Sequence, residues 1–86
     1  MKFAALIPAY NEAASIREVA ERCLRQVDTL IVVDDGSTDG TADALAGLPV
    51  TVLRHAHNQG KAAGLWDGFR QALESDVDAV ITLDGD

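Results

Sequence analysis

The sequence has few of the features that mark membrane, secreted or nucleic-acid-binding proteins. Its 86 residues include one cysteine, Cys23, so no disulfide can form within the chain and we expect a reducing compartment. The longest purely apolar runs, such as residues 3–7, are far shorter than the roughly 18 residues of a membrane-spanning helix, and no signal-peptide pattern opens the chain. Seven basic residues stand against 14 acidic ones, without the basic cluster that nucleic-acid phosphates require. These absences predict a cytoplasmic protein with no membrane span and no nucleic-acid partner.

The composition is that of a folded α/β domain. With 48% hydrophobic and 24% charged residues the chain is globular rather than disordered, and its length allows one domain, residues 1–86. Apolar runs alternate with segments of helical periodicity. The runs predict four strands, at residues 3–7, 30–33, 50–53 and 77–83. The periodic segments predict three helices, at about residues 12–26 with Asn11 as N-cap, at about residues 38–46, and from residue 60 onward.

The last predicted helix carries two glycines, Gly64 and Gly68, one turn apart. Glycine inside a helix costs about 1 kcal/mol relative to alanine, so we expect close packing against the sheet to compensate. The apolar face of this helix is predicted to contain Leu65, Phe69, Ala72 and Leu73. The alternation of strands and helices implies a mostly parallel sheet in the order 3-2-1-4 with helices on both faces, a Rossmann-like three-layer α/β arrangement.

Three of the predicted strands end in polar turns that contain acids. The first strand leads into residues 8–12, the second into residues 34–39 and the fourth into Asp84-Gly85-Asp86. In a parallel sheet these turns converge on one edge, where doubly wound folds bind ligands. Carboxylates gathered there need a cation or a donor from a ligand, and such hard oxygen groups suit Mg²⁺ or Mn²⁺ holding a diphosphate.

The acidic turns also have plainer interpretations. Asp34-Asp35-Gly36 alone is more often a turn than a ligand site. Asp39 can be an ordinary acid in the first turn of a helix, and Asp-Gly-Asp alone occurs in many surface turns.

Several other polar and aromatic residues remain open to two interpretations. Tyr10 can be a half-buried core aromatic, and Trp66 is expected in the core or on a helix surface. His55 and His57 have no partner at zinc-site spacing, so a solvated loop is favoured for both. Lys61 is expected at the surface, with a phosphate contact at the helix start as the alternative.

Together, four motifs resemble the amino-terminal half of the family 2 glycosyltransferases, which are inverting nucleotide-sugar enzymes of the GT-A fold. The motifs are LIPAYNE at residues 6–12, IVVDDGSTDGT at 31–41, NQGKAAG at 58–64 and LDGD at 83–86. Their order and spacing are similar to the family over the whole chain. Residues 58–64 followed by Phe69 most resemble the polyprenyl- and dolichyl-phosphate sugar synthases.

The resemblance implies a site for the nucleotide of a sugar donor. Pro8, Tyr10 and Glu12 would border the base and the ribose. Asp35 would accept a hydrogen bond from the base, uracil or guanine, of a UDP- or GDP-linked sugar. Asp34 would support that turn.

The resemblance also implies a metal at the second acidic motif. Asp84 would contact the ribose or the sugar, and Asp86, with Asp84 beside it, would coordinate Mg²⁺ or Mn²⁺ between the two phosphates. The metal would stabilise the diphosphate as leaving group while an acceptor hydroxyl attacks the anomeric carbon. A chain with a net charge of -7 needs such a cation to hold a diphosphate.

Members of this family continue into a second half that supplies the acceptor site and the catalytic base. We therefore expect the base beyond Asp86, no full catalysis from this chain alone, and a parent protein associated with the inner face of a membrane. Residues 77–83 would then form an edge strand with unpaired backbone groups, which predicts a homodimer through paired edge strands.

Two other functions stay open. One is a non-catalytic nucleotide-binding or assembly module. The other is a phosphoacceptor receiver domain, for which Asp34, Asp35 and Asp84 mimic the acidic residues. That alternative is weaker, because such a domain would begin with the strand before Asp34 and would need a further strand bearing a lysine.

Overall fold

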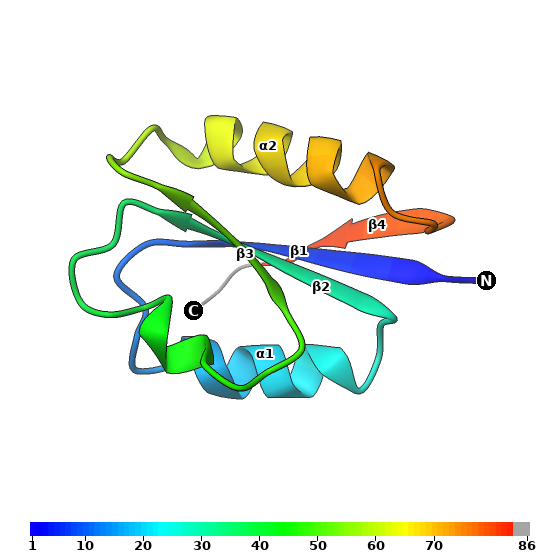
Figure 1. Cartoon of the computed structure of the whole chain (residues 1–86), viewed down its shortest axis with the longest axis horizontal. Helices are drawn as coiled ribbons and strands as arrows, with labels where there is room; N and C mark the ends of the chain where they lie inside the picture. Colours follow the sequence, from blue (N-terminus) through cyan, green and yellow to red (C-terminus); the bar gives the residue numbers. More distant parts are fainter. Residues whose placement is uncertain (84–86) are drawn as a thin grey trace.

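The computed structural model describes residues 1–83 apart from the side chain of Lys61, and Figure 1 shows a sheet between two helical layers. The predicted roles of Asp84, Asp86 and the Lys61 side chain lie outside this description. No helix of the described residues is long and apolar enough to cross a bilayer. The elements in chain order are β1 (Phe3–Ala9), α1 (Ile16–Leu24), β2 (Thr29–Asp35), the 3₁₀ turn η1 (Asp43–Leu45), β3 (Thr51–His55), α2 (Lys61–Leu73) and β4 (Ala79–Thr82).

The four strands are all parallel and lie in the order β3-β2-β1-β4, which confirms the predicted topology. β1 continues through Pro8 to Ala9, two residues further than its apolar run predicts. The N–H of Leu83 donates to the Leu6 carbonyl, so by alternation the nitrogen of Pro8 also faces the β4 side. The pairing of β1 with β4 ends at Leu6. The sheet therefore loses no hydrogen bond at Pro8, although proline has no N–H to donate.

Side chains of the central strands alternate between two apolar layers, one on each face of the sheet. The buried layer on the α1 side contains Ala5, Ile7, Ala9, Ile16, Ala20, Leu30, Val32 and Leu45. The buried layer on the α2 side contains Leu6, Ile31, Val33 and Ala72. The same alternation sends Asp34 toward the first layer and Asp35 toward the second, so these two neighbours enter different environments.

The predicted helix over residues 38–46 is wrong, because only the short turn η1 forms there. Gly40, inside the predicted range, has a φ of 85°, which a right-handed helix does not allow. The Asp39 carboxylate accepts hydrogen bonds from the N–H and hydroxyl of Thr41. These local side-chain bonds replace the helical ladder.

The helix α1 begins at Ile16, later than predicted, and Asn11 is not its N-cap. Asn11 has a φ of 51°, and its side-chain oxygen accepts the backbone N–H of Thr38 from another loop. Ser15 occupies the N-cap position instead.

α2 lies close to the sheet because two positions on its inner face lack a side chain. A Cβ on Gly64 would lie 3.2 Å from Val33 Cγ1, and a Cβ on Gly68 would overlap the Leu6 side chain. The predicted close packing of these glycines is confirmed.

The apolar face predicted for α2 is only half right. Leu65 and Ala72 pack on the sheet, whereas Phe69 and Leu73 remain 37% and 82% exposed. The glycines occupy the inner stripe, so the large residues are turned outward. Trp66, 66% exposed, lies on the helix surface, one of its two predicted places.

We predict that Gly68→Ala lowers the free energy of unfolding by about 1–3 kcal/mol, because the added methyl overpacks against Leu6. This loss should exceed the gain of about 1 kcal/mol that alanine brings to a helix. Urea unfolding measures the difference, with Gly64→Ala as the milder comparison. A stabilised Gly68→Ala variant would mean that α2 lies further from the sheet than described.

Candidate functional site

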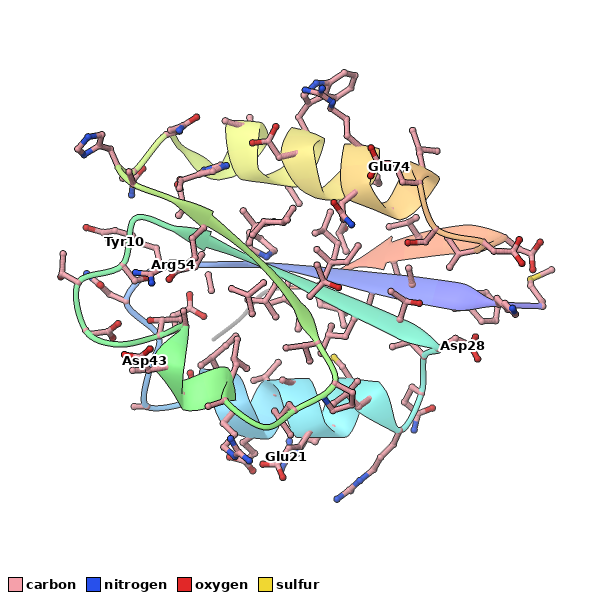
Figure 2. All side chains as sticks on the ribbon, in the orientation of Figure 1. Tyr10, Glu21, Asp28, Asp43, Arg54 and Glu74 are labelled. Carbon is pink, nitrogen blue, oxygen red and sulfur yellow. The ribbon has the colours of Figure 1, made fainter. Side chains whose placement is uncertain are left out.

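The carboxyl ends of β1, β2 and β3 meet at one edge of the sheet, where three loops follow them. Pro8 and Tyr10 come from the end of β1, Asp34 and Asp35 from the end of β2, and Arg54 from the end of β3. Figure 2 shows Tyr10 and Arg54 at this end of the molecule. Tyr10 is 47% exposed, so it is available to a ligand rather than packed in the core. The structure thus brings the predicted residues of the first two strands to one edge.

Asp34 holds the turn after β2. It is 1% exposed, its Oδ1 accepts the N–H of Ser37 at 3.1 Å, and its Oδ2 lies 3.6 Å from Nε of Arg54. Arg54 is its register partner on β3. These contacts fix the backbone of the turn that follows β2.

Asp35 is buried on the opposite face and is surrounded by donors. Its Oδ1 accepts the N–H of Gln59 at 2.8 Å and lies 3.0 Å from Nδ1 of His55, while Oδ2 accepts the N–H of Gly60 at 3.0 Å. Burial raises the pKa of this carboxyl, but the bonds from Gln59, His55 and Gly60 outweigh it and hold the pKa below its ordinary value. Asp35 is therefore an anion with fixed geometry.

His55 connects Asp35 to α2. Its Nε2 lies 2.7 Å from Oδ2 of Asp67, so a carboxylate faces each ring nitrogen. Ionised carboxylates only accept hydrogen bonds, so this placement favours the imidazolium, which donates from both nitrogens, over the neutral ring, which donates from one. The bonds to Asp35 and then to Asp67 raise the pKa of His55 and outweigh its burial.

The predicted solvated loop is wrong for His55 and right for His57. β3 extends to His55, whose side chain is 9% exposed, while His57 lies exposed in the following loop. A parallel alignment of the second and third predicted strands, extended beyond their apolar runs, could have indicated this contact, because His55 lies opposite Asp35 in the register. Asp67 lies seven residues after Gly60 and lacked any such signal.

The loops after β1 and β2 are joined by backbone-to-side-chain hydrogen bonds. The N–H of Asn11 donates to the Ser37 hydroxyl at 2.9 Å, and the N–H of Glu12 donates to the Thr41 hydroxyl at 3.0 Å. The Asp39 carboxylate also accepts the N–H of Ala13 at 3.1 Å. Bonds from the Thr41 hydroxyl and from the backbone outweigh desolvation and lower the pKa of Asp39. Asp39 and Thr41, which the sequence did not single out as site residues, thus hold Glu12 beside β2.

The metal predicted at Asp84 and Asp86 depends on residues outside the description. Among residues 1–83, no group of three or more acidic, histidine or cysteine side chains converges to hold an ion. Carboxylate oxygens in the Asp84-Gly85-Asp86 motif are hard donors that fit Mg²⁺ or Mn²⁺, which fill their shells with phosphate and water.

With this geometry in hand, comparison with known proteins places the chain in a family. The family model described as Glycosyl transferase family 2 matches residues 4–86. The chain belongs to the family 2 glycosyltransferases. This membership favours sugar transfer over an assembly module or a receiver domain.

Its relatives in this family include two transferases whose names contain a lipid phosphate. It is 36% identical over 97 aligned positions to the undecaprenyl-phosphate 4-deoxy-4-formamido-L-arabinose transferase of Proteus mirabilis, covering 99% of this chain and 29% of that protein. It is 29% identical to the UDP-N-acetylglucosamine–dolichyl-phosphate N-acetylglucosaminyltransferase of Methanococcus voltae, covering 94% and 39%. The chain thus spans roughly a third of the length of these relatives.

A solved structure supports the same family fold. The glucosyl-3-phosphoglycerate synthase of Mycobacterium tuberculosis, crystallised with Mn²⁺, UDP and phosphoglyceric acid, matches with a TM-score of 0.79 and 29% identity over 99% of this chain and 33% of that one. The same enzyme has also been crystallised with Mg²⁺ and UDP. The sheet order and the two helical layers described above are therefore those of a GT-A glycosyltransferase.

The His55 cluster predicts a pH dependence of stability. The pKa of His55 is raised, so its contribution is complete below the ordinary value of about 6.5 and is lost as pH rises through the raised value. The pKa of Asp35 is lowered, so its contribution is complete above its ordinary value of about 3.9 and is lost in stronger acid. We expect wild-type stability to fall between pH 6 and pH 8.5.

Urea unfolding over this range measures the effect. At pH 6, His55→Gln should lose about 1–3 kcal/mol, because the charged hydrogen bond to the buried Asp35 carboxylate is removed, and its stability should be nearly flat up to pH 8.5. His57→Gln, at an exposed loop histidine, is the matched control and should follow the wild type. Parallel profiles for wild type and His55→Gln would contradict the ion pairing of His55.

Proposed function

We propose that this chain carries the donor-nucleotide site of an inverting glycosyltransferase, which transfers a sugar from a nucleoside-diphosphate sugar to an acceptor. The observation that carries the proposal is the Asp35 carboxylate, an anion fixed at the ligand-binding edge of a GT-A sheet. Membership of family 2 and the UDP-bound synthase structure support the same activity.

We assign the nucleotide contacts residue by residue. Asp35 accepts an N–H from the base, and Tyr10, exposed at the end of β1, covers the base together with Pro8. Glu12 lies near the ribose, held there through Thr41. UDP is the first choice because the similar synthase binds it, and GDP is the alternative.

Asp84 and Asp86 would hold Mg²⁺ or Mn²⁺, and Asp84 would also contact the ribose or sugar. When bound, the metal supplies Lewis-acid neutralisation of the diphosphate leaving group. The acid-rich chain itself offers little positive charge for that purpose, with 7 basic against 14 acidic residues. The acceptor and a catalytic base beyond Asp86 stay predictions, as do a cytoplasmic location and association of a longer parent protein with the inner face of a membrane.

Nucleotide titration followed by amide shifts tests the proposal. UDP should shift residues flanking Pro8 and residues 34–39, with weak affinity. Asp35→Asn should weaken binding about tenfold or more, because the loss of a charged acceptor costs roughly 1.5–3 kcal/mol. Asp76→Asn, the same change at an exposed site far along the chain, should bind like the wild type. Shifts confined to the helices, or none at millimolar nucleotide, would oppose the assignment.

Metal should bind detectably only together with nucleotide. One or two carboxylates do not replace the water shell of Mg²⁺ or Mn²⁺, whereas the phosphates of a diphosphate complete it. Paramagnetic broadening by Mn²⁺ should therefore reach residues 84–86 when UDP is present and fade when UDP is omitted. Equal broadening in both states would contradict the shared site.

We also propose that the chain self-associates through β4. β4 lies at an edge of the sheet, and Ile81 and Leu83 are 43% and 40% exposed. The N–H of Leu83 faces β1, so by alternation the N–H of Thr82 faces the open edge, where a second β4 can pair with it. The exposed Asp76 and Asp78 repel their counterparts, so added salt should tighten the dimer.

Sedimentation at several concentrations tests this pairing. Thr82→Pro should give a monomer, because proline removes the outward N–H, and Thr82→Val, which keeps it, should still dimerise. A wild type that stays monomeric, or a dimer indifferent to Thr82→Pro, would rule out association through this edge.

A further inference from the structure

The ring of His55 is fixed by three elements that meet at the nucleotide edge. The residue itself ends β3, Asp35 ends β2, and Asp67 lies on α2. The two nitrogen-to-oxygen distances, 3.0 Å to Asp35 and 2.7 Å to Asp67, place the cation between two carboxylates. The side chains of His55 and Asp35 are each 9% exposed, whereas that of Asp67 is 40% exposed.

Three of the acceptor positions of Asp35 are taken by donors among the described residues. A carboxylate has about four lone-pair positions, two on each oxygen. Among the described residues, Oδ1 receives His55 and Gln59, while Oδ2 receives Gly60 alone. The remaining acceptor position is therefore on Oδ2, and its direction is set by the contacts that fix the other three.

We propose that His55 is a positioning residue for base recognition: its imidazolium fixes the Asp35 carboxylate so that Oδ2 accepts an N–H from the base and rejects a base with a lone pair there. This inference rests on the proposed function. Uracil and guanine present a ring N–H, whereas cytosine presents an unprotonated ring nitrogen at the equivalent place. A lone pair facing an anionic oxygen is repelled, so selectivity between bases depends on how rigidly that oxygen is held.

The charges around His55 favour a fixed position of the Asp35 carboxylate. Among the described side chains, the charged groups that contact His55 from the packed elements are Asp35 on β2 and Asp67 on α2. Arg54, the neighbouring cation on β3, contacts Asp34 on the other side of the sheet. When His55 loses a proton, its single remaining N–H can satisfy Asp35 or Asp67 but not both, and Asp35 loses part of its restraint.

The amide side chains of Asn and Gln separate the two bonds of His55. The amide nitrogen of Asn reaches the place of Nδ1, which faces Asp35, and the amide nitrogen of Gln reaches the place of Nε2, which faces Asp67. His55→Asn should therefore keep the bond that positions Asp35, and His55→Gln should lose it. If His55 only filled space, His55→Asn would not keep the positioning of Asp35 better than His55→Gln.

The experiment measures the affinities of UDP and CDP for the wild type and both variants between pH 6 and pH 8.5. UDP and CDP carry the same diphosphate, so protonation of the phosphates changes both affinities alike and leaves their ratio unchanged. We expect wild type to favour UDP about tenfold or more at pH 6.5, His55→Asn to stay within about threefold of that ratio, and His55→Gln to bind both alike. The wild-type ratio should fall toward that of His55→Gln as pH rises.

Two further measurements guard against misfolding and against failure of the proposed function. Imidazole ¹⁵N shifts of the free wild type should show both nitrogens of His55 protonated at pH 7, where an ordinary histidine is mostly neutral. Asp67→Asn, at a more exposed site, should lower the titration midpoint of His55 and reduce the UDP preference.

The outcomes distinguish the two claims. A UDP preference that is equal in wild type, His55→Gln and Asp67→Asn would overturn the positioning role and leave the nucleotide site intact. A His55 that carries no proton on Nδ1 at pH 7 would overturn the positioning role as well, because that nitrogen faces Asp35. Failure of the wild type to bind either nucleotide would overturn the proposed function and this inference together.

Discussion

The buried carboxylate of Asp35 is the group on which the ligand-binding edge depends. An ion in a water-poor position is stable only when donors surround it, and here the donors also anchor β3 and the loop that follows it. His55 anchors the end of β3 and, through Asp67, the helix α2, while the N–H groups of Gln59 and Gly60 anchor the loop between them. The geometry of the loop thus follows from satisfying one charge.

The cluster of Asp35, His55 and Asp67 forms only where neighbouring segments of the backbone lie close together. Gly36 follows Asp35 with a φ of 78°, and a Cβ there would lie 2.5 Å from the backbone nitrogen of Asn58. Gly68 allows α2 to lie directly on Leu6, which brings the neighbouring Asp67 within hydrogen-bond distance of the sheet. The glycines of this chain therefore serve the site as well as the core.

The sequence was sufficient to predict the strand order and the two-sided packing, because apolar runs and helical periodicity alternate without interruption. It also predicted that Pro8, Tyr10, Asp34 and Asp35 meet at one edge, since parallel strands end together. The helix predicted over residues 38–46 does not form, because the Asp39 side chain accepts hydrogen bonds there and Gly40 adopts a positive φ. His55 was missed because β3 extends beyond its apolar run, so its burial depends on contacts with Asp35 and Asp67 that lie far away in sequence.

The central claim is that the Asp35 carboxylate receives the base of a donor nucleotide. A crystal structure of the chain with UDP and Mn²⁺ tests it through one distance, from N3 of uracil to Oδ2 of Asp35. We predict a hydrogen bond of about 2.7–3.2 Å, with His55 still between Asp35 and Asp67. Uracil bound away from this edge, or an Asp35 whose oxygens contact only His55, Gln59 and Gly60 in the UDP complex, would contradict the account.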